Sequence, residues 1–461
     1  MGVKMQRLRI LKPFLPYLLA AGDLMLVFLG YFLAFAVRFP VEVPVFNWQP
    51  FTRVIPWVGT ATLVLFGGLG LYQGRRNGPS SITGGVVTGI AGVMVVTMAL
   101  TFWFRGFAFP RSVLVLAMFI QVQLICVWRY FFWYFERWLY GRQELLVIGR
   151  DLEVPGVLEK LVCPPGSWFS VQQVITPEDL DQLPGLLKKA DAVLLSPSLP
   201  REKKAKVLTD CLEARREAYL VPDLYDIMLS HSSMLQLNDL PVVEVRDIRL
   251  SVLQRAAKRG TDLFFALLCL LFMAPVLAAC AVVVAVSSPG PVFYIQERVG
   301  LKGKPFLLYK FRTMVHNAEK HTGPVLSAEN DPRTTRAGKF LRATRLDELP
   351  QLFNVIKGNM SIVGPRPERS FFVEQFVNEL PDYRYRYLVK PGLTGMAQVF
   401  GKYTTSAEDK LRFDLYYIRH YSPILDLKII LQTIPVAISG EAANGLSRKK
   451  AKRRPVLRFL K

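Results

Sequence analysis

Cysteine and histidine are too sparse and too scattered in this sequence to suggest a metal centre or a disulfide framework. The 461 residues include five cysteines, none of which forms a CxxC pair, and three of the five lie in apolar segments. This pattern argues against structural disulfides and zinc and suits a reducing cytosol. The four histidines are dispersed, and His316 and His321 do not share a helix face at ligand spacing, so we assign no histidine a catalytic role.

Acidic residues are also in short supply. Lysine and arginine number 58 against 36 aspartates and glutamates, which gives a formal net charge of +22. An excess of this size favours anionic partners, namely phosphate-bearing substrates, anionic lipid headgroups or nucleic acid. Because no aromatic and basic RNA or DNA motif is visible, we expect no nucleic-acid partner.

Long apolar runs, in contrast, are abundant: 51% of the residues are hydrophobic, and they cluster. Four runs each approach the ~20 residues needed to cross a ~30 Å hydrocarbon core, and the first lacks the cleavage motif of a signal peptide. The sequence therefore predicts a four-helix transmembrane bundle over residues 1–140. Asp23 interrupts the first run and either pairs inside the bundle or lies near an interface; we favour the interface. The four runs are Leu15–Val37, Val54–Tyr72, Ile82–Phe104 and Val113–Phe135.

The distribution of basic residues indicates the orientation of these helices. The N-terminus and the segment after the fourth run are basic, and the second loop contains Arg75-Arg76. The first loop has no lysine or arginine between Arg38 and Arg53, whereas the third loop has an arginine at each end. By the positive-inside rule both ends of the four-helix unit are cytoplasmic, although the third loop dissents.

Residues 141–250 have the composition of a soluble domain. Short apolar strands that alternate with helices predict a small parallel α/β sheet. The segment Ile148–Asp151 is not the GxGxxG loop that binds a dinucleotide, so a structural or regulatory role is expected. The predicted buried strands are residues 144–150, 191–197 and 217–224, and the predicted helices are Leu183–Lys189 and Lys203–Arg216.

The next apolar run, Leu263–Val286, contains no charge and has Pro275 at its centre. By length alone it would be a fifth transmembrane helix. Pro275 removes a backbone donor and forces a bend, and the basic residues on both flanks are hard to place on opposite sides of a membrane. We therefore predict a re-entrant helix, in which two ~18 Å half-helices enter and leave the same leaflet.

The chemistry concentrates in residues 336–369, where Asp347 and Glu348 are adjacent within a strongly basic neighbourhood. Apolar residues at helical spacing from Leu349 to Ile356, followed by Gly358, predict a short helix with Asp347 at or next to its N-cap. An ionised aspartate can attack phosphorus while arginines carry the phosphate oxygens and a neighbouring glutamate holds a divalent cation. Alone, an aspartate at a helix start is more often only a cap.

The run LRATRLDELPQLFNVIKGNMSIVGPRP closely resembles the catalytic core of the bacterial sugar transferases, the monotopic polyprenyl-phosphate hexose-1-phosphate transferases. The resemblance extends from about Lys258 to Thr433 and includes Gly290–Gly300 and Tyr309–Met314. It implies a re-entrant helix bent at a Ser-Pro pair, which is Ala274-Pro275 here, and a degenerate Rossmann-type module before the catalytic part.

The resemblance also implies transfer of hexose-1-phosphate from a UDP-sugar to undecaprenyl phosphate, with release of UMP. Asp347 would form a covalent aspartyl-phosphosugar intermediate, Glu348 would hold Mg²⁺, and Arg366 would engage the nucleotide end. Lys310 and Arg342 would steady the diphosphate oxygens. The other residues expected to bind substrate are Arg312, Gln351, Pro365, Pro367 and Asp414, the last of which matches a third acidic position of the family site.

Two further features suit a membrane surface. The amphipathic segment Leu411–Ile418 carries aromatic residues typical of a membrane interface. Residues 448–461 hold eight lysines or arginines and no acid, which predicts a tail that binds anionic lipid.

The sequence thus predicts a multi-pass membrane α plus α/β protein of the bacterial inner (cytoplasmic) membrane, with its active site on the cytoplasmic face. The predicted domains are the transmembrane domain (1–140), the Rossmann-like domain (141–250), the catalytic α/β domain with its re-entrant helix (251–440) and the basic tail (441–461). Expected partners are a UDP-sugar (glucose or galactose first, an N-acetylated hexose open), undecaprenyl phosphate and the bilayer. The polysaccharide pathway, a homodimer and any ligand of the Rossmann-like domain stay open. The alternative is a non-catalytic scaffold or transporter subunit for lipid-linked glycans.

Overall fold

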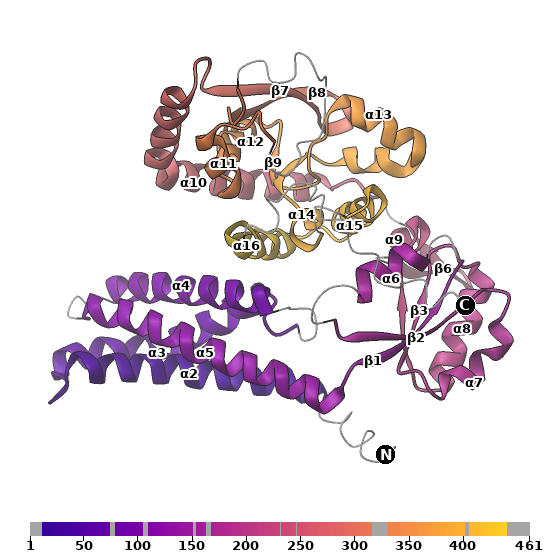
Figure 1. Cartoon of the computed structure of the whole chain (residues 1–461), viewed down its shortest axis with the longest axis horizontal. Coiled ribbons are helices and arrows are strands. Elements are labelled where there is room, and N and C mark those ends of the chain that lie inside the picture. The colour runs from indigo at the N-terminus through magenta and orange to yellow at the C-terminus, as the bar shows by residue number, and fades with distance from the viewer. Residues whose placement is uncertain are drawn as a thin grey trace. The chain divides into compact units, whose positions relative to one another are not determined.

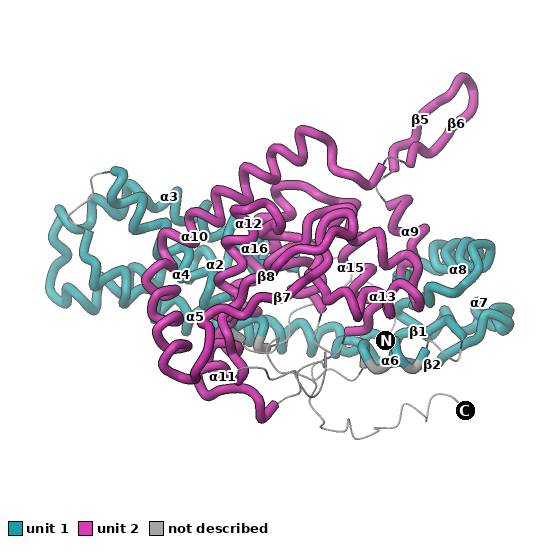
Figure 2. The backbone as a smooth tube through the Cα atoms, turned by 90° about the horizontal axis from the view of Figure 1, so that it is seen from above, with its two compact units in different colours: residues 1–221, 453–461 teal, residues 222–452 magenta. Residues whose placement is uncertain are grey.

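The structure is a computed structural model of the chain that divides into two compact units (Figure 2). Among the described residues, unit 1 extends to Val221 and unit 2 begins at Pro222. The predicted basic tail lies outside the described residues. The described residues are 12–73, 79–104, 109–150, 154–162, 167–230, 232–245, 247–315, 331–401 and 405–439.

Four long helices, α2 to α5, lie side by side in unit 1 (Figure 1). Helix α2 packs along α5, and α4 packs against both α3 and α5. Among the described residues these four helices, together with α10 of unit 2, are long and apolar enough to cross a membrane. Helix α3 starts nine residues before the predicted run, because Asn47 and Arg53 hide its first turns from a hydropathy reading. The bounds are α2 Leu15–Arg38, α3 Val45–Gly68, α4 Pro79–Trp103 and α5 Arg111–Tyr140.

Asp23 lies inside this group of helices. It is 0% exposed and forms an ion pair with Arg129 of α5, which is 5% exposed. Arg129 also donates a 2.7 Å hydrogen bond to the carbonyl oxygen of Leu71 and lies over the rings of Phe66 and Tyr72. The favoured prediction, that Asp23 lies near a membrane interface, is therefore wrong. Its burial is possible because Arg129 supplies the partner of opposite charge that a buried carboxylate needs.

Removal of either member of this ion pair is expected to destabilise the helices strongly. Asp23→Ala or Arg129→Ala leaves one buried charge unpaired, which should lower the free energy of unfolding by about 3–5 kcal/mol. The double variant Asp23→Leu/Arg129→Met removes both charges and should recover most of that loss. Thermal unfolding of the detergent-solubilised protein checks this, and single variants as stable as wild type would contradict it.

A four-stranded parallel sheet follows the helices, with strand order β2-β1-β3-β4. Strands β1 and β3 are apolar and buried, as predicted, while β2 was missed because the adjacent Gln172 and Gln173 interrupt its alternation of apolar and polar residues. Strand β4 forms the sheet edge and is exposed, so the prediction that it is buried is wrong. The strands are β1 Gln143–Ile148, β2 Phe169–Ile175, β3 Ala192–Leu195 and β4 Glu217–Leu220, and the helices are α6 Val154–Val162, α7 Leu183–Leu187 and α8 Arg201–Glu213.

Unit 2 begins with residues that the sequence analysis placed in the preceding domain. Helix α9 (Leu224–Leu229) contacts α15 (Ala407–Arg419), and its Ile227 belongs to the core of this unit. Strands β5 (Ser233–Leu237) and β6 (Leu240–Glu244) form an antiparallel hairpin that stands away from the rest of the unit (Figure 2).

Helix α10 (Val252–Ser287) contains Pro275 and changes direction along its length in both overall views (Figures 1 and 2). A proline inside a helix removes one backbone hydrogen bond and clashes with the preceding turn, which accounts for a bend. The half before Pro275 buries Ala266 in the main core of unit 2. The half after it buries Cys280 and Val284 against Phe311. Both halves therefore pack on the same unit.

The main core of unit 2 surrounds the short parallel pair β9 and β10, with apolar residues from α12, α15 and α16 packed around it. Strands β7 and β8 form a separate antiparallel pair. The remaining elements are β7 Phe293–Val299, β8 Pro305–Phe311, α11 Arg336–Ala343, α12 Gln351–Lys357, β9 Ser361–Val363, α13 Ser370–Glu379, β10 Gly392–Thr394, α14 Met396–Phe400 and α16 Pro423–Ser439.

Candidate active site

Asp347 and Glu348 lie in a 3₁₀ turn, Leu346–Glu348, between α11 and α12. The N-cap of α12 is Pro350, three residues after Asp347, so the prediction that Asp347 lies at or next to this N-cap is wrong. Arg345, directly before the turn, has φ of 59°, a left-handed conformation that is unfavourable for a residue with a side chain. Strain of this kind is typical of functional sites, where the surrounding structure holds it in place.

Glu348 is the centre of a cluster of positive charges. Its Oε1 atom accepts hydrogen bonds from Lys310 Nζ at 3.0 Å and Arg366 Nη2 at 2.7 Å, and it lies 3.5 Å from Arg345 Nη1. Burial opposes ionisation of Glu348, but Arg366 and then Lys310 outweigh it and hold its pKa well below the usual value. Glu348 is therefore an anion that holds three cationic side chains close together. These side chains could bind the oxygens of a diphosphate.

Asp347 has the opposite electrostatic balance. It is 8% exposed, and its Oδ1 atom is buried without a hydrogen-bond partner among the described residues. Burial and then the charge of Glu348 raise the pKa of Asp347, against the lowering effect of Lys310, Arg342 and Arg345. Two adjacent carboxyls in environments that separate their pKa values can take different chemical roles.

Arg342 reaches this region from α11, which lies close to the backbone after β8. Its Nε atom donates a 2.9 Å hydrogen bond to Thr313 Oγ1. The close approach requires Gly338, because a Cβ atom there would lie 2.0 Å from the carbonyl oxygen of Thr313. The position of Arg342 near Asp347 therefore depends on a glycine four residues earlier.

The turn that carries Arg366 follows β9 directly and is fixed by the segment that includes β10. The backbone N–H of Gly364 donates to Thr394 O at 2.8 Å, and that of Gly392 donates to Pro365 O at 2.9 Å. A Cβ atom on Gly392 would lie 2.1 Å from Gly364 N, so the two backbones touch. The Gly-Pro-Arg-Pro segment and the Pro-Gly-Leu-Thr-Gly segment thus pack directly against each other, and each fixes the backbone of the other.

Asp414, the predicted third acidic residue, supports this turn from behind. It is 1% exposed and forms an ion pair with Arg386 at 2.8 Å. Arg386 in turn donates a 3.1 Å hydrogen bond to the backbone oxygen of Arg366. Burial raises the pKa of Asp414 to about 6, against the lowering effect of Arg386. Asp414 therefore acts on the Arg366 turn through Arg386 and has a supporting position.

Residues 253–440 match the family of bacterial sugar transferases. A UDP-glucose:undecaprenyl-phosphate glucose-1-phosphate transferase of Caulobacter vibrioides is 40% identical over 191 residues, which are 40% of this chain and 71% of the relative. The chain belongs to the bacterial sugar transferase family. The matched region of the family includes Asp347, Glu348, Arg366 and all the residues that position them.

Longer relatives match over a smaller share of their length. A UDP-N-acetylgalactosamine-undecaprenyl-phosphate N-acetylgalactosaminephosphotransferase of Aeromonas hydrophila is 45% identical over 189 residues, 40% of this chain and 44% of the relative. A UDP-glucose:undecaprenyl-phosphate glucose-1-phosphate transferase of Escherichia coli (strain K12) is 42% identical over 229 residues, 49% of each chain. The chain thus spans about half the length of these relatives.

Two residues that were predicted to bind substrate, Arg312 and Gln351, are buried in the protein. The guanidinium of Arg312 is buried and donates to the carbonyl oxygens of Ser288 at 2.5 Å and Pro289 at 3.2 Å, so it fixes the end of α10. This role differs from the predicted diphosphate contact. Gln351 is buried at the first position of α12.

The residues that anchor the other end of α10 were not predicted from the sequence. Asp262 accepts hydrogen bonds from Ser361 Oγ at 2.8 Å and from Ile362 N at 2.9 Å, which ties α10 to the strand that leads into the Arg366 turn. Lys258 forms a buried 2.8 Å ion pair with Asp426. The sequence does contain a signal for these anchors, because Lys258 and Asp262 are four residues apart and so lie on one face of a helix. In the prediction of membrane topology, Lys258 counted only as a basic residue beside the apolar run.

The amphipathic segment Leu411–Ile418 also differs from its prediction in one respect. Tyr417 is buried in the core, where its hydroxyl lies 2.8 Å from Asp426 Oδ1 and donates to it. Tyr416 is exposed on the same helix. Tyr417 therefore stabilises the fold and does not lie at a membrane interface.

A substitution at Gly338 tests whether α11 positions Arg342. Gly338→Ala is expected to push α11 away from Thr313 and to cost about 1–3 kcal/mol of stability, with loss of transferase activity because Arg342 moves. The matched control is Gly260→Ala in α10, where a Cβ atom meets nothing within 4 Å and stability should hold or rise slightly. Thermal unfolding and transferase activity measure the two effects, and equal behaviour of the two variants would contradict the prediction.

Proposed function

We propose that this protein transfers sugar-1-phosphate from a UDP-sugar to undecaprenyl phosphate and releases UMP. The observation that carries the proposal is the pairing of a buried Asp347 oxygen, which has no hydrogen-bond partner in the described part of the chain, with a cluster of cations gathered by Glu348. The names of the relatives divide between glucose, galactose and N-acetylgalactosamine donors, so the donor is identified only by experiment.

In the first half-reaction a carboxylate oxygen of Asp347 bonds to the sugar-bearing phosphorus. The bridging P–O bond breaks, and UMP leaves with the bond's electron pair. In the second half-reaction an oxygen of the lipid phosphate bonds to the same phosphorus and the bond to Asp347 breaks. The product is undecaprenyl-diphosphate-sugar, and the carboxylate is regenerated.

The positive charges around Glu348 would receive the diphosphate. Arg366, Lys310 and Arg345 already converge on one carboxylate oxygen, and their hydrogen-bond donors can turn to phosphate oxygens when a donor binds. Arg342 stands on the α11 side of Asp347 and balances charge on the phosphoryl group. The Asp414–Arg386 pair would hold the backbone of Arg366 in place while its side chain turns to the phosphate oxygens.

Magnesium fits this set of residues as a proposed cofactor. No group of three or more His, Cys, Asp or Glu that could hold a metal occurs among the described residues. Mg²⁺, however, is commonly bound by one or two carboxylates together with substrate phosphates. Glu348 and the diphosphate would hold it, with the Asp347 carboxylate adjacent, and the metal would offset diphosphate charge.

The re-entrant placement of α10 and the membrane location belong to the same proposal. Both halves of α10 pack on unit 2, and both ends are tied to polar groups of that unit, Lys258 to Asp426 at one end and Ser288 to Arg312 at the other. A straight helix across the bilayer would carry one half out of reach of these contacts. This supports entry and exit through one leaflet, with Asp347 on the cytoplasmic side of an inner membrane.

The experiment that tests the function measures UMP release from a panel of UDP-sugars, with and without undecaprenyl phosphate and Mg²⁺. Lipid-dependent release from one donor establishes the reaction and identifies the sugar. No release from any donor by folded protein in lipid would instead favour the alternative, a membrane scaffold or transporter subunit that binds lipid-linked glycans without catalysis.

The pKa of Asp347 predicts the pH dependence of the first half-reaction. The nucleophile must be ionised, and burial beside Glu348 raises its pKa above the usual value of 3.8. The single-turnover rate of UMP release should therefore fall as the pH is lowered, with a midpoint above that of an ordinary aspartate. Intrinsic tryptophan fluorescence at each pH verifies that the protein stays folded, and a midpoint at or below 3.8 would contradict the assignment.

A further inference from the structure

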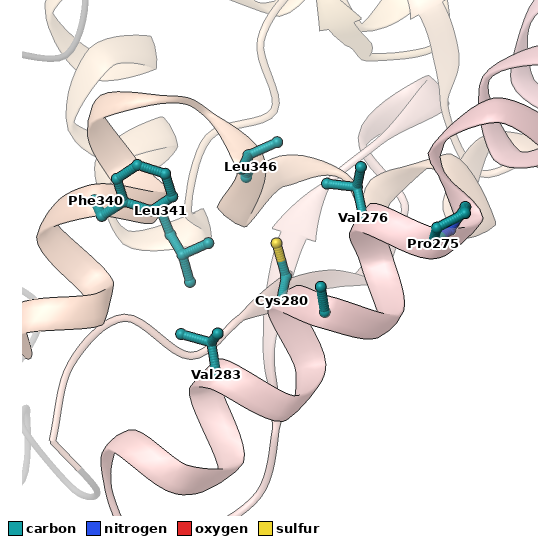
Figure 3. A pocket seen from close by; sticks show the side chains of 8 residues that line it. Pro275, Val276, Cys280, Val283, Phe340, Leu341 and Leu346 are labelled. Carbon is teal, nitrogen blue, oxygen red and sulfur yellow. The ribbon is translucent and has the colours of Figure 1, made fainter.

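An apolar pocket of about 430 Å³ lies directly beside the turn that carries Asp347 (Figure 3). Five of its lining residues come from α10 between Pro275 and Val283, and Phe340 and Leu341 of α11 face them. Leu346, the residue before Asp347, completes the wall. All the lining side chains are built of carbon, apart from the sulfur of Cys280.

The pocket is open on the side of α10 that carries exposed apolar residues. Pro275, Ala279, Val283 and Phe340 all line it and are all exposed. Phe272, Val282 and Val286 continue this apolar surface along α10. A surface of this kind is typical of a protein face that contacts lipid.

Residues that line the pocket are adjacent in the chain to residues of the charge cluster. Phe340 and Leu341 line the pocket, and the next residue of α11 is Arg342, which lowers the pKa of Asp347. Leu346 lines the pocket, and Asp347 follows it. The apolar pocket thus adjoins the turn that carries the buried Asp347 carboxylate and its flanking cations. The two together are complementary to a ligand with a hydrocarbon chain on one side and a phosphate on the other.

We propose that this pocket binds the isoprene units next to the phosphate of the polyprenyl-phosphate acceptor and so delivers that phosphate to Asp347. The inference rests on the proposed function and names the acceptor site of the same reaction. A membrane phospholipid is a poorer occupant, because its phosphate also carries a headgroup and would place an unreactive diester beside Asp347. The acceptor has a terminal phosphate, and its free oxygens are the ones that must reach the phosphosugar.

Filling the pocket tests this assignment by kinetics. Ala279→Leu adds a side chain to the wall, whereas Ala278→Leu makes the same change on the adjacent exposed residue, which does not line the pocket. We expect Ala279→Leu to raise the KM for undecaprenyl phosphate about tenfold (~1.4 kcal/mol), with a smaller change in the KM for the UDP-sugar. Ala278→Leu should change neither. Equal acceptor KM values for the two variants would overturn the proposal.

Photo-crosslinking of the full chain in nanodiscs provides a readout that does not depend on turnover. The probe is a polyprenyl phosphate with a diazirine in the isoprene unit next to the phosphate. Support consists of labelling within residues 275–283 or 340–346 that excess undecaprenyl phosphate blocks and phosphatidylglycerol does not. Labelling elsewhere, or equal blocking by phosphatidylglycerol, would overturn the proposal.

The two experiments separate the pocket from the reaction. Specific labelling of the pocket in a protein that releases no UMP from any donor would uphold the binding site and refute the transferase function. UMP release that depends on undecaprenyl phosphate, combined with labelling outside the pocket, would uphold the function and refute the site.

Discussion

Replacement of Asp347 by asparagine is expected to lower lipid-dependent UMP release by a factor on the order of 10⁴. Asparagine has nearly the same shape, but its amide does not attack phosphorus. Because burial and Glu348 raise the pKa of Asp347, the ionised form is disfavoured in the folded protein, and a neutral side chain should leave stability unchanged or increase it. The variant therefore should lose activity without loss of fold.

The covalent intermediate is tested by trapping. Wild-type protein incubated with a donor that is radiolabelled at the sugar-bearing phosphate, in the absence of undecaprenyl phosphate, should retain label on the protein, and Asp347→Asn should retain none. Asp239→Asn, at an exposed aspartate in the β5–β6 hairpin, is the matched control and should behave as wild type. Label retained by Asp347→Asn, or the initial-velocity pattern of a ternary complex, would contradict the covalent scheme.

The sequence was sufficient to predict the features that depend on local pattern. Apolar runs of transmembrane length predicted α2, α4 and α5 closely, and the alternation of apolar strands with helices predicted the parallel sheet. The proline in an uncharged run predicted the bend in α10. The family resemblance predicts that Asp347 and Glu348 act in one site, because the motif that contains them is long and specific, and this stays a prediction.

Long-range pairings could not be predicted in the same way. Asp23 finds its partner more than a hundred residues away in α5, and nothing near Asp23 in the chain indicates that. The sequence around Arg312 predicted that it binds phosphate. In the structure, its guanidinium instead donates to a backbone carbonyl oxygen at the end of α10. Asp414 likewise works through Arg386, whose role depends on the backbone of Arg366. Charge in a sequence shows that a partner is needed, but only the fold identifies it.

Glu348 should be the second most sensitive position, for a different reason. Glu348→Gln removes the anion that Lys310, Arg345 and Arg366 share, so the three cations would repel one another and the turn would lose its electrostatic centre. We expect a decrease in kcat of roughly 10²–10³-fold. We also expect a loss of about 2 kcal/mol of stability, less than for a fully buried pair because Arg345 and Arg366 are each about a third exposed.

The same substitution has a consequence for Asp347 that no general loss of structure would produce. The charge of Glu348 is the second-largest factor that raises the pKa of Asp347, after burial. Its removal should lower that pKa, so the pH midpoint of the residual first half-reaction should shift downward relative to wild type. Glu379→Gln, at an exposed glutamate at the end of α13, is the matched control and should leave the midpoint in place. A midpoint that stays the same or moves upward in Glu348→Gln would mean that the two carboxyls do not interact as the structure places them.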